Sequence, residues 1–160
     1  MNWRNMMDTA RQLAGQTQPQ QPGRPRQEPL KRAVSSAYYA MFHSLCQSNA
    51  DTIIGRRNDL VSHLAWTRTY RALDHRQAKN RLTQAQRDLP TQAQGFAATF
   101  GFMQEQRHAA DYNPHSTFVR EEVLNLLNAA DAATREYMRM PRNERRAVAA
   151  VVLLQGRTID

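Results

Sequence analysis

One run of polar residues, near the end of a predicted helix, combines the residue types that phosphate chemistry uses. Arg107 and Asp111 are four residues apart, as are His108 and Tyr112, so each pair shares a strip of the last helical turn. An arginine held by a carboxylate can bind a phosphate, and a neighbouring histidine can move a proton near neutral pH. His115 follows just beyond the helix end. The alternative is a structural role, in which Arg107 and Asp111 form an intrahelical ion pair and His108 and Tyr112 pack at the end of the helix. Spacing alone favours this structural role.

A second polar strip lies earlier in the chain, within a strongly periodic helical segment. Ser36, Tyr39 and His43 recur at intervals of three and four, and Arg32 precedes them by one turn. This strip could line a cleft opposite the first polar run. The alternative interpretation, favoured for the neighbouring Tyr38, places the tyrosines in the core with their hydroxyls bonded to local partners.

The elements that position both strips are predicted to be helices, because apolar residues recur at three- and four-residue spacing and no segment alternates like a strand. Helices are expected at 2–14, 28–48, from Asn58 or Asp59 to about residue 82, from Thr91 to Asn113-Pro114, and at about 143–155. Another is expected to start at Pro114 with Asn113 as its cap.

Several local signals refine these boundaries. Gly15 is expected to cap the first helix, and 49–57 is expected to be a connection. Thr91 with Gln94 fits a capping box. In the helix that ends near residue 82, the residues expected to face inward are Leu60, His63, Trp66, Tyr70 and Leu73.

Four long helices with short flanking ones, joined mostly by short links, predict an all-α fold, an up-and-down bundle of four to five helices. The expected organisation is an N-terminal helix at 1–15, a Gln/Pro-rich linker at 16–27, the bundle at 28–140, and a C-terminal helix and tail at 141–160. The linker follows from its prolines, which remove helix donors, and from its lack of apolar side chains.

The composition of the chain narrows the range of possible functions further. The 160 residues carry a net charge of +8, which favours an anionic partner such as nucleic acid or an acidic protein surface. No signal peptide or spanning segment is recognisable, and the single Cys46 fits a reducing compartment, so a cytoplasmic location without membrane contact is expected. No phosphate loop, nucleophile elbow or zinc spacing is present, so no metal or cofactor is expected.

At both polar strips the sequence resembles the HEPN family of RNA-binding and RNA-cleaving helical domains. Tyr38-Tyr39-Ala40-Met41-Phe42 is similar to the family's Tyr-Tyr-Ala-x-Phe pattern on an early helix. Arg107-His108-Ala109-Ala110-Asp111-Tyr112 is similar to its Arg-x-x-Ala-Asp-Tyr run on a later helix. The resemblance spans roughly residues 30–137, and the pair of motifs is more specific than either motif alone.

The resemblance implies a helical bundle that dimerises and binds RNA in a cleft shared by two copies. In its active members, metal-independent endoribonucleases, a ribose 2′-hydroxyl attacks the adjacent phosphate. Carried onto this chain, the catalytic residues would be Arg107, His108, Asp111 and Tyr112, and the RNA-binding residues would be Arg32, Tyr39, His43 and His115. A toxin-antitoxin or defence role, with a nucleotidyltransferase-like antitoxin as partner, would follow.

The sequence departs from the family pattern at one point, so the resemblance does not decide whether the chain cleaves RNA. Its nucleases place a His a few residues after the Arg, whereas His108 follows Arg107 at once and His115 comes only after the Asn113-Pro114 corner. Two further functions therefore remain as alternatives. One is a non-catalytic helical interaction module, and the other is a structural protein of a mobile element.

Overall fold

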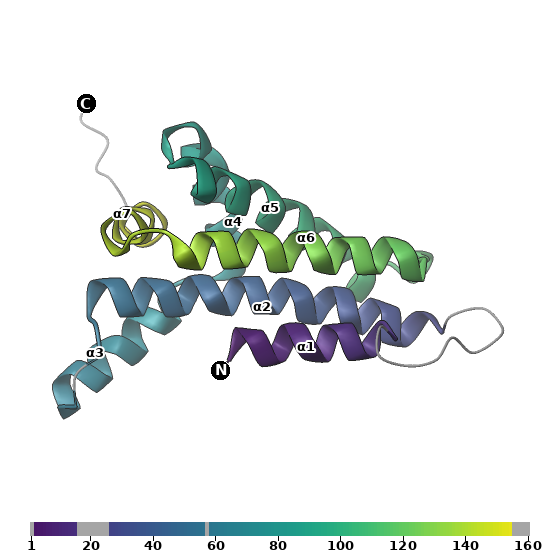
Figure 1. The fold of residues 1–160 in the computed structure, drawn as a ribbon, viewed down its shortest axis with the longest axis horizontal. Coiled ribbons are helices and arrows are strands. Elements are labelled where there is room, and N and C mark those ends of the chain that lie inside the picture. The colour runs from purple at the N-terminus through teal and green to yellow at the C-terminus, as the bar shows by residue number, and fades with distance from the viewer. Residues whose placement is uncertain (1, 16–25, 57, 155–160) are drawn as a thin grey trace.

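The computed structural model describes residues 2–15, 26–56 and 58–154, which form seven α-helices, one 3₁₀ turn and no strand. The predicted all-α helical bundle is confirmed. In Figure 1, α1, α2 and α6 run along the long axis, α5 is inclined to them, and α7 is seen end-on. The elements are α1 (Trp3–Leu13), α2 (Gln27–Ile53), α3 (Leu60–Arg71), α4 (His75–Ala85), η1 (Gln86–Asp88), α5 (Thr91–Tyr112), α6 (Arg120–Arg139) and α7 (Arg142–Leu153).

Helix α2 is the centre of the bundle and contacts α1, α3, α5, α6 and α7. It is longer than predicted, because the expected connection at 49–57 is helical as far as Ile53. Tertiary contacts explain the difference. Arg142 of α7 donates to the carbonyl oxygen of Asp51 at 2.8 Å, and Arg146 donates to that of Thr52 at 2.9 Å. These side chains satisfy carbonyls that the last helical turn leaves unpaired.

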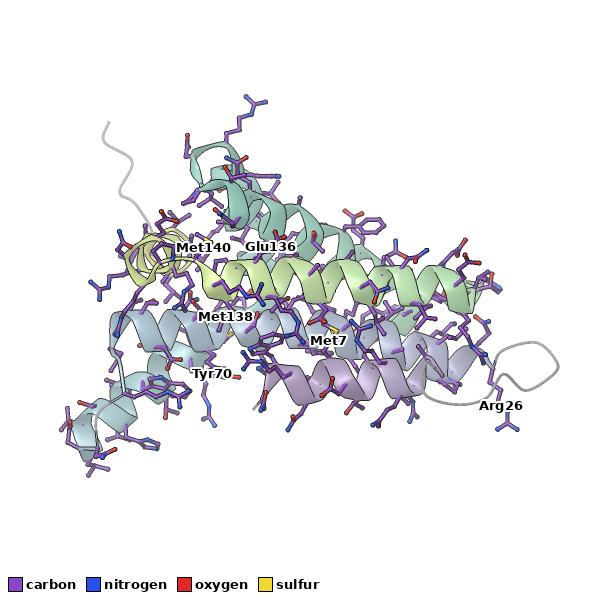
Figure 2. All side chains as sticks on the ribbon, in the orientation of Figure 1. Met7, Arg26, Tyr70, Glu136, Met138 and Met140 are labelled. Carbon is purple, nitrogen blue, oxygen red and sulfur yellow. The ribbon has the colours of Figure 1, made fainter. Side chains whose placement is uncertain are left out.

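Helix α1 packs on α2 and shares its core. Trp3, Met7 and Ala10 are buried, and Figure 2 shows Met7 between the two helices. The predicted helix and its cap are confirmed, since Gly15 has a φ of 79°, a conformation that glycine adopts without strain. Most of the predicted linker, 16–25, lies outside the described residues, while Gln27 already belongs to α2.

The single helix predicted to run to residue 82 is wrong, because the chain breaks into α3 and α4. Asp59 caps α3 as predicted, and Asp74 caps α4 by accepting from the backbone of Gln77 at 2.8 Å. Leu73, between the two helices, is buried. Helix α3 projects from the bundle in Figure 1 and buries no residue, so Leu60, expected inside, is 74% exposed. His63, also expected to face inward, is exposed.

The helix start predicted at Thr91 is confirmed, but its predicted capping box and the helix start predicted at Pro114 are wrong. Helix α5 begins at Thr91 behind Pro90, and Gln94 donates to the carbonyl oxygen of Leu89 at 2.7 Å, so no capping box forms. Asn113 ends α5 but does not start α6, which begins at Arg120. The 113–119 segment is a loop, in which the Asn113 side chain accepts from the backbone of His115 at 2.9 Å. Such a side-chain turn competes with helix initiation.

The last predicted helix is present at Arg142–Leu153. Among the described residues, no helix is long and apolar enough to cross a bilayer.

Candidate functional site

Arg107 lies near the end of α5, where α5 crosses α2. Its Nη2 donates to the hydroxyl of Tyr39 at 3.0 Å and to that of Tyr112 at 3.4 Å. Its Nε lies 2.8 Å from Oδ2 of Asp111, an ion pair by distance, although the N–H direction does not make this contact a hydrogen bond. The Arg107 side chain is only 15% exposed. The guanidinium is therefore held in one orientation before any ligand arrives.

Aromatic rings surround the same guanidinium. Its central carbon lies 5.4 Å from the ring centroids of Tyr39 and Tyr112 and 5.7 Å from that of Tyr38. Such cation–π contacts favour the charged form. Burial by itself lowers the pKa of Arg107, but attraction to Tyr39, Asp111 and Tyr112 outweighs burial and raises this pKa above its usual value. The cation is permanent.

Asp111 joins α5 to α2. Besides pairing with Arg107, its carboxylate accepts a hydrogen bond from the hydroxyl of Ser35. One turn earlier on α2, the ammonium of Lys31 donates to the carbonyl oxygen of Asn113 at 3.4 Å. The predicted i,i+4 pair is thus confirmed, and it forms part of a contact between two helices.

The structure brings together some of the residues predicted for this site and separates the others. It gathers Arg107, Asp111, Tyr112 and Tyr39, which we call the Arg107 cluster. His43 joins its edge through a stacked contact with Tyr39, at 6.5 Å between ring centroids.

Three predicted site residues lie apart from the guanidinium. His108 is exposed and packs on the ring of Tyr112, with 5.0 Å between centroids, as its spacing predicts. His115 is exposed in the loop after α5, and Arg32 is exposed on α2. Neither of these two exposed residues has a described contact with the Arg107 cluster.

The sequence interpretation missed His75, the first residue of α4. Its imidazole packs on Phe42 at 3.9 Å between ring centroids, and its edge meets Tyr39 at 5.4 Å. Its Nδ1 lies 2.8 Å from the hydroxyl of the buried Tyr38. The available signal was Asp74, a strong helix-capping residue directly before it. The sequence interpretation instead treated the helix as continuous to residue 82, which left no helix start at Asp74.

Burial and charge hold the His75 imidazole neutral. Burial lowers the pKa of His75, the positive charge of Arg107 lowers it further, and Asp74 opposes both with a smaller effect. Burial also raises the pKa of Tyr38 far above its usual value, so its hydroxyl stays protonated. The Arg107 cluster and the adjacent His75 therefore combine a permanent cation with an imidazole that is neutral near pH 7 and can accept a proton.

His75 should make stability depend on pH. Its folded pKa lies below the unfolded value of 6.5, so the unfolded chain takes up the proton first as pH falls. The stability contributed by neutral His75 is complete above that value and is lost as pH falls through it toward the folded pKa. In urea titrations from about pH 7 to about pH 5, His75→Gln should show a smaller loss of unfolding free energy than the parent. An equal loss in both proteins would contradict a depressed pKa.

Among the described residues, no group of three His, Cys, Asp or Glu side chains could hold a metal ion. Burial raises the pKa of the Cys46 thiol to about 12, so it acts as a small apolar residue and not as a nucleophile.

Fold and site together define an all-helical protein with a preorganised arginine at a helix crossing. The chain matches no family model, no curated protein and no solved structure.

Proposed function

We propose that the chain is an HEPN-like RNA-binding protein in which Arg107 binds a backbone phosphate. One observation carries the proposal: the Arg107 guanidinium is fixed through Nε and Nη2, while its Nη1 makes no hydrogen bond to a described residue. A donor held in place by its own neighbours loses little entropy when a phosphate binds, because the fork is already oriented.

Charge around the cluster also supports an anionic ligand. The chain has a net charge of +8, and Lys31 of α2 reaches the end of α5, where its ammonium donates to the carbonyl oxygen of Asn113. Asp111 is the opposing group, because its carboxylate competes with any phosphate for the same guanidinium. Removal of the Asp111 carboxylate should therefore strengthen anion binding, whereas removal of a purely structural ion pair should not.

Asp111→Asn should bind a single-stranded RNA oligonucleotide about two- to fivefold more tightly than the parent, measured by fluorescence anisotropy. The range follows from the roughly 0.4–1 kcal/mol that a partly exposed ion pair contributes and that a competing ligand must overcome. The matched control is Asp8→Asn, which makes the same charge change on the exposed face of α1. An equal gain in both variants would show only a general charge effect and would contradict the assignment to Arg107.

A second candidate function is cleavage of the bound RNA without a metal, and the neutral imidazole of His75 beside the cluster favours it. In this reaction the 2′-hydroxyl attacks the adjacent phosphate and loses its proton to a base. The 5′-oxygen of the next nucleotide leaves and gains a proton. Arg107 would stabilise the charge on the phosphorane, and His75 would replace the predicted His108 as the group that moves the proton.

The protein partners proposed for this chain rest on its resemblance to the HEPN family. A second copy of the chain and a nucleotidyltransferase-like antitoxin are the proteins we propose to bind it, in a toxin-antitoxin or defence setting. The alternatives, an interaction module without catalysis and a structural protein of a mobile element, use the same basic surface for other ligands. Neither predicts that removal of the Asp111 charge strengthens RNA binding beyond the Asp8 control.

A further inference from the structure

A pocket of about 450 Å³ opens between α2 and α3, beside the Arg107 cluster. Helix α2 contributes Phe42, His43 and Cys46 to its wall, and α3 contributes Trp66, Thr67, Tyr70 and Arg71. Leu73, between α3 and α4, closes one side. Figure 2 labels Tyr70 where α3 approaches α2. The volume lies within the range of small-molecule sites, and four of the eight residues in the wall carry aromatic or imidazole rings.

The rings of this pocket form a row that leads to Arg107. Trp66 stacks on Tyr70 at 5.2 Å between centroids, Tyr70 on His43 at 5.9 Å, and His43 on Tyr39 at 6.5 Å. Tyr39 then accepts the hydrogen bond from Arg107. Interplanar angles along the row are 25°, 18° and 30°, so the ring faces are nearly parallel.

Hydrogen bonds fix the orientation of the first rings. The indole Nε1 of Trp66 donates to the Asp51 carboxylate at 2.8 Å, and the hydroxyl of Tyr70 lies 2.7 Å from Nδ1 of His43. Burial lowers the pKa of His43, so its ring is neutral near pH 7. Neutral, fixed rings suit a flat aromatic ligand, because stacking on them costs little side-chain entropy.

Charge complementarity selects the kind of flat ligand. Arg71 is exposed at the pocket, and the row of rings ends at the Arg107 guanidinium. A ligand that satisfies both features is planar at one end and anionic at the other, as a nucleotide is. Alternation of stacking rings with cations is how proteins hold single-stranded nucleic acid without reading its sequence.

We propose that this pocket binds a nucleobase of a single-stranded RNA whose neighbouring phosphate lies on Arg107. The inference rests on the proposed function and adds to it a base-binding subsite that involves Trp66 and Tyr70. It also explains why α3 projects from the bundle yet keeps Trp66 and Tyr70 half-buried against α2.

The experiment titrates the full chain with a single-stranded RNA oligonucleotide and, separately, with a free mononucleotide, and follows tryptophan fluorescence and anisotropy. Trp66→Leu should lower RNA affinity about fivefold to hundredfold, as expected for the loss of one stacked base. Thr67→Phe, which fills the pocket and keeps every ring, should do the same. Leu64→Ala, on the exposed face of α3, is the matched control and should bind like the parent.

The salt dependence separates failure of this inference from failure of the proposed function. Trp66→Leu should keep the parent slope of log affinity against log salt, because it removes no phosphate contact. Arg107→Ala should reduce that slope by about 0.7, the value for one phosphate of a single strand. Parent-like affinity in both pocket variants would overturn the base subsite alone. Fluorescence quenching by the mononucleotide without RNA binding would overturn RNA as the ligand and point to a free nucleotide.

Discussion

Replacing Trp3 with alanine is expected to lower the free energy of unfolding by about 3–5 kcal/mol, the usual cost of removing a large buried aromatic side chain. Trp3 is 2% exposed, and its ring also meets the guanidinium groups of Arg4 at 4.8 Å and Arg135 at 5.8 Å. The loss should be read from urea unfolding, with a fall in melting temperature on the order of 10 °C.

Phe102→Ala is the matched control, since Phe102 is an aromatic residue that is 51% exposed on α5. Its effect should stay within about 0.5 kcal/mol. If Trp3→Ala has the same melting temperature as the parent, α1 contributes nothing to the stability of the core and does not unfold together with the bundle. A large loss confirms that the N-terminal helix and the bundle unfold as one unit.

Arg107→Ala should weaken RNA binding about tenfold to hundredfold, because a charge-assisted hydrogen bond contributes roughly 1.5–3 kcal/mol. Arg107→Lys should recover only part of that loss, since an ammonium keeps the charge but lacks the planar fork. Any metal-independent cleavage, measured in the presence of a chelator, should fall with binding in both variants. The readouts are anisotropy for binding and gel analysis of labelled RNA for cleavage.

Stability must be separated from binding in this experiment. The Arg107 side chain is largely buried among tyrosine rings, so the alanine variant should also lose about 1–3 kcal/mol of unfolding free energy. Binding is therefore measured well below each melting transition. Arg139→Ala, an exposed arginine at the end of α6, makes the same charge change elsewhere. If Arg107→Ala loses stability but no more RNA affinity than this control, the cluster is structural and the interaction-module alternative takes over.

The helices that were predicted well are those whose signals are local. The three- and four-residue spacing of apolar residues within 28–48 predicted the core of α2, and Asp59 predicted the start of α3. The Arg107–Asp111 pair followed from i,i+4 spacing alone. Each of these features depends on residues within about one helical turn of one another, so the chain order is sufficient to predict it.

The predictions that were wrong involve segments whose neighbours in space are far away in sequence. Helix α2 extends to Ile53 because arginines of α7 bind its last carbonyls, some 90 residues downstream. The chain breaks before His75, where Asp74 starts a new helix and Leu73 is buried in the core. A periodic pattern cannot distinguish one long helix from two that share a register across a short break.

The sequence by itself determined that the chain is helical, that its charge is basic, and that Arg107 pairs with Asp111 at a helix end. Only the tertiary structure decided what surrounds that arginine. Tyr39 is 68 residues from Arg107, and Tyr38 is 37 residues from His75, yet each pair is joined by a hydrogen bond. The reason is physical: helix periodicity follows from contacts within a turn, whereas the crossing of α2, α4 and α5 is set by packing of the whole core.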